Sequence, residues 1–244
     1  DSVPRTLLRE HYRCNPLIIG FCNQKYYKGQ LLIMKDVPKL DYGAADYPVR
    51  IFRTAKGYHS HDMTNDRQIA VIERDVLPIC NETTMDEIGI ISPYRNQANR
   101  IDKRLCGNNA MESDTIHKFQ GREKKKIIFS TVANQITPFM DDAKLINVAV
   151  SRAIDQFIMV MPHSYELNHG SNIGDLIRYI EHWNPDGAVD SKIVSYFDLL
   201  NPGGDSDELT KFKIKIQGKS KFESENIIET LLKEVLDENP KAYS

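Results

Sequence analysis

The chain has 244 residues, 41% of them hydrophobic and 27% charged, so it can bury a core and is not disordered by composition. Its 32 basic and 34 acidic residues give a formal net charge of -2, which offers no bulk argument for a polyanion partner. A mean hydropathy of -0.46 and the lack of a long apolar run exclude a transmembrane helix. Four scattered cysteines without a CxxC pair argue against a disulfide framework or structural zinc, so we expect a reducing, cytoplasmic setting.

Short apolar strands alternate with helices along most of the chain. Helical spacing predicts helices over 17–27, 66–77, 96–105, 143–153 and 173–183. Asn15 and Pro16 mark the start of the first, Pro78 ends the second and Gly107 ends the third. Continuous apolar runs predict strands at 49–52, 88–92, 126–131 and 157–161, and a further short element at 113–116. This order predicts an α/β fold, a mainly parallel sheet with helices on both faces.

The composition changes after Trp183. We expect residues 1–183 to form the main domain and the Pro-, Gly- and Asp-rich stretch 184–210 to be a linker. Residues 211–244, with a strand at 211–216 and a helix at 222–236, would begin a small appendage. Because dense patterning begins at Asp1, we expect the chain to be a fragment of something longer.

Two residues near the first helix form a candidate nucleotide site. Tyr12 and Arg13 combine a planar ring, which can stack on a base, with a guanidinium that can bind phosphate oxygens. The alternative is a partly buried tyrosine beside an arginine whose stem packs on apolar surface.

Two further segments carry polar groups between apolar elements. In 113–123, Gly121 would let the backbone approach a ligand, Glu123 could accept from a sugar hydroxyl, and Thr115 and His117 could donate to phosphates. The alternative is a glycine-turn hairpin followed by a solvated lysine run. Arg152, at the end of a predicted helix, could neutralise charge on a transferred phosphoryl group, or it could simply compensate the helix C-terminus.

Four segments together are similar to motifs of one family. Residues 11–16 (HYRCNP) resemble Q-Y-R-M-x-P, 92–97 (SPYRNQ) resemble P-Y-x-x-Q, 115–123 (TIHKFQGRE) resemble T-V-[DH]-x-F-Q-G-x-E, and 147–153 (NVAVSRA) resemble N-V-A-[LV]-[ST]-R-A. In this order they resemble the second RecA-like motor domain of superfamily 1 helicases, in the branch of the nonsense-mediated decay helicase. The resemblance implies a RecA-like, P-loop NTPase-type fold.

The resemblance also implies roles for individual residues. Tyr12 would lie on the adenine, Arg13 and Arg152 would reach the γ-phosphate as arginine fingers, and Gly121 and Glu123 would face the nucleotide. The residues facing single-stranded nucleic acid would be Ser92, Pro93, Tyr94, Arg95, Thr115 and His117. Gln120 and Arg122 would couple the two sites. The family's usual glutamine and methionine are replaced by His11 and Cys14, and Ile154-Asp155 stands where the family often has a lysine.

No G-x-x-x-x-G-K-[ST] phosphate loop and no acidic pair for Mg²⁺ occur in the sequence. ATP would therefore bind between this domain and a first motor domain that holds Mg²⁺, and the chain alone would be inactive. We expect an ATP-dependent helicase acting on single-stranded or unwinding DNA, or on RNA. The alternatives are a non-catalytic nucleic-acid-binding module with a RecA-like fold and the motor part of a helicase-nuclease. No metal site is predicted, because His59 and His61 lack a third ligand.

Charge is distributed unevenly along the chain. Residues 94–126 contain nine basic and four acidic side chains, whereas residues 181–244 contain eight basic and thirteen acidic ones. We expect the first stretch, including the lysine run 124–126, to form a basic rim facing the nucleic acid. The near-neutral total predicts weak binding by this domain alone.

Overall fold

The computed structural model describes residues 9–36, 42–43, 46–55, 60–107, 110–163, 165–167 and 170–191. They belong to one compact unit that extends to Lys192. The strand and helix predicted at 211–216 and 222–236 lie outside the described residues.

A parallel six-stranded sheet forms the centre of this unit, in the order β5-β4-β6-β7-β3-β8. All its pairings are parallel. Its strands, in chain order, are β3 (Val49–Arg53), β4 (Ile88–Ser92), β5 (Glu112–Thr115), β6 (Lys124–Ser130), β7 (Ala153–Met161) and β8 (Ala188–Asp190). The run Ile127–Ile128–Phe129 is fully buried, as expected of a strand covered on both faces.

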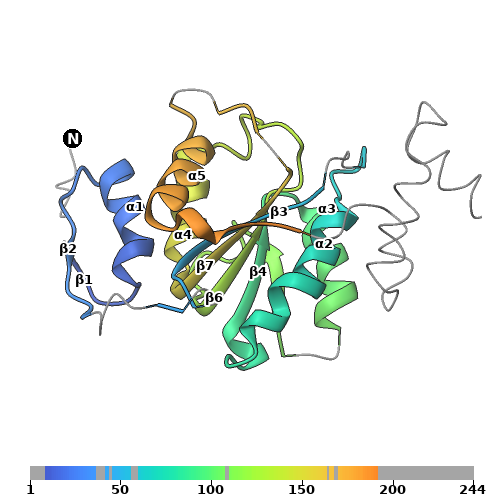
Figure 1. Ribbon diagram of the computed structural model, residues 1–244, viewed down its shortest axis with the longest axis horizontal. Coiled ribbons are helices and arrows are strands. Elements are labelled where there is room, and N and C mark those ends of the chain that lie inside the picture. The colour runs from blue at the N-terminus through green and yellow to red at the C-terminus, as the bar shows by residue number, and fades with distance from the viewer. Residues whose placement is uncertain are drawn as a thin grey trace, which may run out of the picture. The chain divides into compact units, whose positions relative to one another are not determined.

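Helices cover the two faces of the sheet (Figure 1). One layer consists of α1 (Pro16–Tyr26), α4 (Ala143–Ser151) and α5 (Asn172–Trp183), and the other of α2 (Asp66–Val71) and α3 (Arg95–Ile101). Ile18, Ile146 and Ile177 of the first layer share a core with Phe129 and Phe157 of the sheet. The α/β architecture with a mainly parallel sheet and helices on both faces is therefore confirmed.

Caps and breakers set the helix boundaries. The Asn15 side chain accepts from the Leu17 N–H at 3.0 Å, and Pro16 occupies the first turn of α1, as predicted. The predicted helix 66–77 is α-helical only to Val71 and continues as a π-helical turn, Ile72–Val76, and a 3₁₀ turn, Leu77–Cys80. Pro78 has no N–H for an i to i−4 bond, so the regular hydrogen-bond ladder cannot pass through it. The predicted helix 96–105 likewise changes after Ile101 to a π-helical turn that ends at Gly107.

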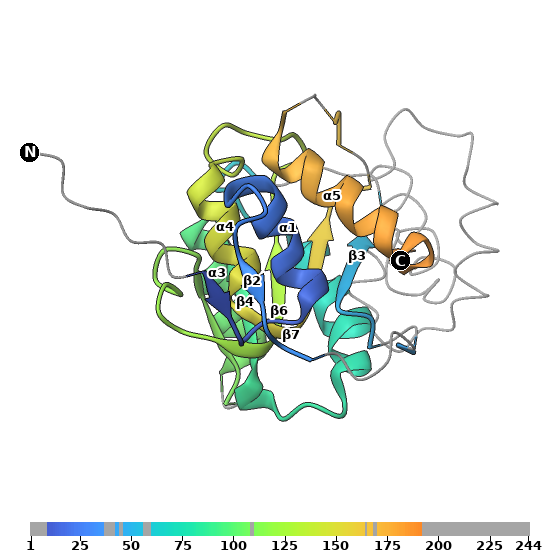
Figure 2. The same ribbon diagram turned by 90° about the vertical axis from the view of Figure 1, so that its left-hand side faces the viewer.

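The sequence patterns do not predict three short strands, β1 (Glu10–His11), β2 (Leu32–Ile33) and β8. Strand β1 pairs in parallel with β2 beside α1 (Figure 2). Strand β8 lies within the stretch expected to be a linker, and it pairs with β3 at the edge of the sheet. The sheet therefore continues beyond Trp183.

Candidate nucleotide and nucleic-acid sites

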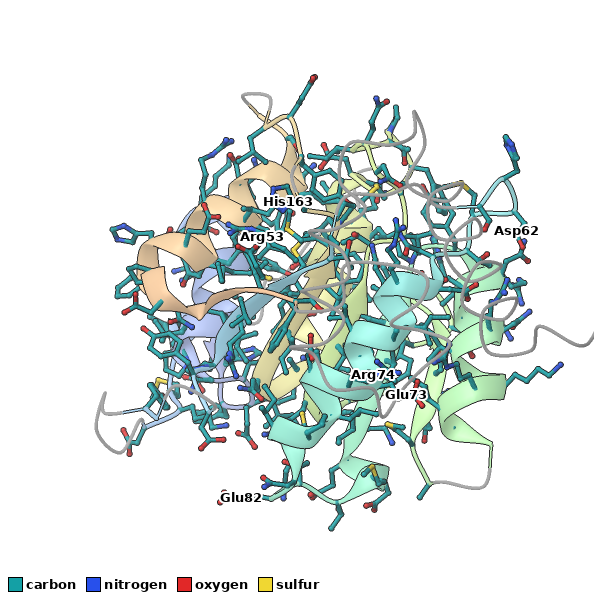
Figure 3. The ribbon with its side chains drawn as sticks, turned by 45° about the vertical axis from the view of Figure 1, so that its right-hand side comes forward. Arg53, Asp62, Glu73, Arg74, Glu82 and His163 are labelled. Carbon is teal, nitrogen blue, oxygen red and sulfur yellow. The ribbon has the colours of Figure 1, made fainter. Side chains whose placement is uncertain are left out.

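The predicted site residues fall at two opposite edges of the sheet. Because all six strands are parallel, their amino ends meet at one edge and their carboxyl ends at the other. Glu123 and Arg152 immediately precede the paired residues Lys124 and Ala153, so they lie at the amino edge. Figure 3 shows the same polarity. Arg53 ends β3 and His163 follows β7, and both lie far from Glu82, which precedes β4.

Two arginines converge at the amino edge. Arg13 donates to the Ser151 carbonyl at 2.8 Å and is paired with the Glu123 carboxylate, while Arg152 contacts the Ser151 hydroxyl at 3.3 Å. The Arg13 and Glu123 side chains are 30% and 37% exposed. Among the described residues, neither arginine has an acceptor for its Nε–H, although both of these atoms are buried. The cluster thus contains two buried donors that the described residues leave without an acceptor.

The turn that carries Arg13 is fixed to the end of α4. The Asn15 N–H donates to the Ile154 carbonyl at 2.7 Å, and the Cys14 thiol lies 3.6 Å from the Ser151 carbonyl. On the other side, His11 Nε2 accepts from the Cys14 N–H at 3.0 Å. Contacts within the domain thereby hold together residues that are distant in the sequence.

The electrostatic environment of this cluster is positive. Burial lowers the pKa of Arg152, and the charge of Arg13 lowers it further. Burial also lowers the pKa of His11, with Arg13 again adding to the shift, which favours the neutral imidazole whose Nε2 accepts the Cys14 bond. Two permanently charged guanidiniums beside one carboxylate leave a net positive charge, which favours an anion.

Tyr12 and Gly121 are close in the sequence to members of this cluster, because Tyr12 precedes Arg13 and Gly121 lies two residues before Glu123. Tyr12 is 62% exposed, and its hydroxyl donates to Glu10 at 2.7 Å, so its ring is accessible. Gly121 has a φ of +90°, which disfavours any other residue, and no atom lies within 4 Å of the position of a Cβ. The backbone at Gly121 is therefore open to close approach.

The residues predicted to bind single-stranded nucleic acid lie at the carboxyl edge, where Ser92 of β4 and Thr115 of β5 are neighbours in the sheet. Ser92 and Thr115 are 0% and 6% exposed, and the Ser92 hydroxyl accepts from the Tyr94 N–H at 3.3 Å. Pro93 is also buried, Tyr94 is partly buried, and Arg95 and His117 are exposed. The buried members form the base of this surface, and the exposed ones are available to a ligand.

One segment joins the two edges. Residues 116–123 leave β5 at the carboxyl edge and enter β6 at the amino edge. Within this segment the buried Phe119 ring packs so closely on Gly89 of β4 that a Cβ added to Gly89 would lie only 2.7 Å from the ring. Strand β4 lies between β5 and β6, so the hairpin alternative for this segment is wrong. Gln120 is exposed, and the Arg122 carbonyl accepts from Arg152 at 3.5 Å.

The lysine run does not lie beside the strand-facing surface, contrary to the prediction. It begins β6 and therefore lies at the amino edge, where Lys126 is buried. Lys124 donates to the Asp86 carbonyl at 2.6 Å, and Lys125 lies 2.6 Å from Glu87. Most of the basic residues of 94–126 are paired with carboxylates rather than free for phosphate. These pairs are Arg100–Asp66, Arg104–Glu73, Lys118–Asp114, Arg122–Glu112, Lys124–Glu112, Lys125–Glu87 and Lys126–Asp46.

A buried amide network at the carboxyl edge was not predicted. Gln68 accepts from the Ser130 hydroxyl at 2.8 Å and from the Val132 N–H at 3.0 Å, and Gln97 donates to Ser130 at 3.0 Å. Val132 has a φ of +69°. A glutamine within the apolar face of helix 66–77 was the one available sign of this network.

The described residues contain no group of three or more His, Cys, Asp or Glu side chains that could hold a metal ion. Over the same parts of the chain, no helix has the length and apolar character needed to cross a bilayer.

Comparison with known proteins shows the family. The AAA_12 family model, described as an AAA domain, matches residues 2–164. The DNA replication ATP-dependent helicase/nuclease DNA2 of Gallus gallus is 31% identical over 166 residues, covering 63% of this chain and 16% of that protein. Helicase SEN1 of Saccharomyces cerevisiae is 30% identical over 201 residues, covering 70% of this chain and 9% of that protein.

The C-terminal domain of a possible DNA helicase from Lactobacillus plantarum, a solved structure, aligns with 73% of this chain and 98% of its own, at 14% identity and a TM-score of 0.42. A TM-score of 0.42 is too low to assign a fold, so the fold assignment rests on the strand order of this chain. The chain spans less than a fifth of the two longer relatives. Since the family match contains all four motif segments, the chain belongs to the AAA_12 family and is a C-terminal RecA-like motor domain of the superfamily 1 helicase type.

Proposed function

We propose that this domain is the second motor domain of an ATP-dependent helicase or translocase, and that it supplies one wall of an ATP site shared with a first motor domain. The observation that carries the proposal is the amino-edge cluster. Arg13 and Arg152 meet there around Ser151, and each has a buried Nε–H without an acceptor among the described residues. A triphosphate would provide acceptors and negative charge at this position.

In this proposal, the two arginines act on the phosphoryl group that is transferred to water. That reaction depends on positioning and on neutralising charge on the equatorial oxygens, which forked guanidiniums do well. Burial strengthens their effect, because partial desolvation raises the strength of each charge interaction. The α4–β7 junction and Asn15 hold both arginines on rigid elements, which limits the cost of organising them.

The remaining amino-edge residues would hold the nucleoside. The exposed Tyr12 ring would stack on the adenine, Gly121 would admit the ligand close to the backbone, and Glu123 would accept from the ribose. Glu123 is paired with Arg13, so on nucleotide binding the Arg13 guanidinium would exchange the Glu123 carboxylate for a phosphate group. The described residues offer no ligand set for Mg²⁺, so we assign the metal to the first motor domain.

We place the single strand at the carboxyl edge, where Arg95 and His117 are exposed. Gln120 and Arg122 would couple the two sites, because both belong to the segment that links Thr115 to Glu123 and the Arg122 carbonyl is bound by Arg152. DNA is the substrate we favour, since a relative's name specifies DNA replication, with RNA as the alternative.

The test is strand-stimulated ATP hydrolysis by the full-length protein. We expect Arg152→Ala and Arg13→Ala each to lower turnover by about a thousandfold. Arg104→Ala is the matched control, because Arg104 pairs with Glu73 on the far side of the sheet (Figure 3 labels Glu73), and it should leave turnover within about twofold. Turnover that survives loss of both Arg13 and Arg152 would refute the arginine-finger assignment. Strand binding without any hydrolysis by the unmodified protein would favour the non-catalytic binding module.

A further inference from the structure

One phenylalanine is exposed where all the others described are buried. Phe139 is 50% exposed, whereas the five other phenylalanines in the described part of the chain are at most 3% exposed, namely Phe21, Phe52, Phe119, Phe129 and Phe157. Leaving an aromatic ring in water forgoes the stabilisation that its burial would bring. Such a ring needs an explanation from its surroundings.

Phe139 lies beside Tyr94 at the carboxyl edge of the sheet. The ring centroids are 5.5 Å apart with an interplanar angle of 46°, and the Tyr94 hydroxyl is 2.9 Å from the Thr137 hydroxyl. The two rings come from segments 45 residues apart, after β4 and between β6 and α4. Together they form an aromatic shelf, by which we mean Tyr94 and Phe139.

The turn that carries Phe139 is held on both sides. The next residue, Met140, is fully buried, and its N–H donates to the Thr137 hydroxyl at 3.3 Å. The Asp141 carboxylate then accepts from the Ile173 N–H at 2.8 Å and from Ser171 at 3.0 Å, at the start of α5. Phe139 is therefore presented by an anchored turn, so binding to it costs little ordering entropy.

The polar groups around the shelf suit a nucleic acid better than a protein. Arg95, next to Tyr94, is exposed, and so is His117, which follows Thr115 at the same edge. A single strand needs an aromatic face for a base and a cation for the adjoining phosphate, and this surface offers both. Two rings form a patch far smaller than the roughly 800 Å² per partner of a stable protein interface.

We propose that Phe139, supported by Tyr94, stacks on a base of the bound single strand. The proposal rests on the function proposed above and extends it, because Phe139 is not among the residues assigned so far to nucleic-acid binding. Stacking is tolerant of sequence, since every base has a π face, as a translocating motor requires.

The test compares two fluorescent oligonucleotides of equal length, oligo-dT and the same backbone with abasic sites, by anisotropy with the full-length protein at low salt. We expect Phe139→Ala to weaken oligo-dT binding about tenfold and to leave binding of the abasic strand within about twofold. Phe139→Trp should restore oligo-dT binding, because an indole stacks at least as well. Trp183→Ala is the control, since Trp183 is a 42% exposed ring at the end of α5, and it should change neither affinity.

Two results would overturn the stacking proposal while leaving strand binding intact. One is an equal loss of affinity for both oligonucleotides on Phe139→Ala, and the other is no loss for either. If the unmodified protein binds neither oligonucleotide, the proposed function fails and the stacking proposal fails with it.

Discussion

Replacing Gln68 by leucine tests whether the buried amide network stabilises the carboxyl edge. Gln68 is fully buried, and its side-chain oxygen accepts from the Val132 N–H and from the Ser130 hydroxyl. Leucine has a similar volume, so the change removes the acceptor without leaving a large cavity. The Val132 N–H then has no acceptor, and Val132 occupies a left-handed conformation that a β-branched residue adopts only under constraint.

The expected cost follows from these contacts. A buried donor left without its partner costs about 1–3 kcal/mol, and the Ser130 hydroxyl loses a second bond. Gln68 Nε2 makes only a long 3.5 Å contact with the Thr131 hydroxyl, so losing this amide group changes the free energy of unfolding little. We expect Gln68→Leu to lower the free energy of unfolding by about 2–3 kcal/mol, which lowers the Tm of a domain this size by roughly 4–12 °C.

Urea denaturation is the measurement, with the midpoint as the readout and an unchanged slope showing that the unfolding remains comparable. Gln120→Leu is the matched control, because it makes the same chemical change at an exposed position and should alter stability by less than about 0.5 kcal/mol. Equal midpoints for the two variants would refute the view that this network stabilises the turn at Val132.

Two further predictions concern the amino edge and the segment between the edges. His11→Gln, which keeps an acceptor, should make stability less dependent on pH. The folded pKa of His11 lies below its unfolded value, so the wild-type contribution to stability is present above the unfolded pKa and is lost as the pH falls. The urea midpoints at about pH 7.5 and about pH 5.5 should therefore differ more for the wild type than for the variant. Gly89→Ala should cost about 1–3 kcal/mol in thermal melts, because its Cβ would lie 2.7 Å from the Phe119 ring and 2.9 Å from Lys124, and a variant as stable as the wild type would show that Phe119 moves aside freely.

Local sequence patterns predict the elements but not the order in which they assemble. The α1 helix could be predicted because Asn15 and Pro16 give an explicit start, and β4 because a continuous apolar run is typical of a strand buried on both faces. Strand order depends on long-range pairing that no local signal encodes. For this reason the lysine run after Glu123 was assigned to the wrong edge, although the limits of β6 were nearly correct.

The candidate sites divide in the same way. The motif segments predict roles for Arg13, Glu123 and Arg152, but nothing in their spacing shows that Arg13 and Arg152 both contact Ser151. Phe139 could not be singled out, because an exposed aromatic residue and a buried one look alike in a sequence. Strand β8 has only three residues, too few to show a periodicity.

The two proposed sites lie at opposite edges of the sheet, and this placement constrains how they could communicate. The edges are separated by the length of β4 and β6, so no side chain can contact ligands at both. Residues 116–123 run from Thr115 at the carboxyl edge to Glu123 at the amino edge, and the buried Phe119 packs against Gly89 midway along that path. Because Phe119 is close-packed, the segment would respond to a displacement at one end by moving as a unit rather than by bending freely. A change in the Arg13–Glu123 pair would therefore be passed toward Thr115 and His117, as the proposed coupling of ATP hydrolysis to nucleic-acid binding requires.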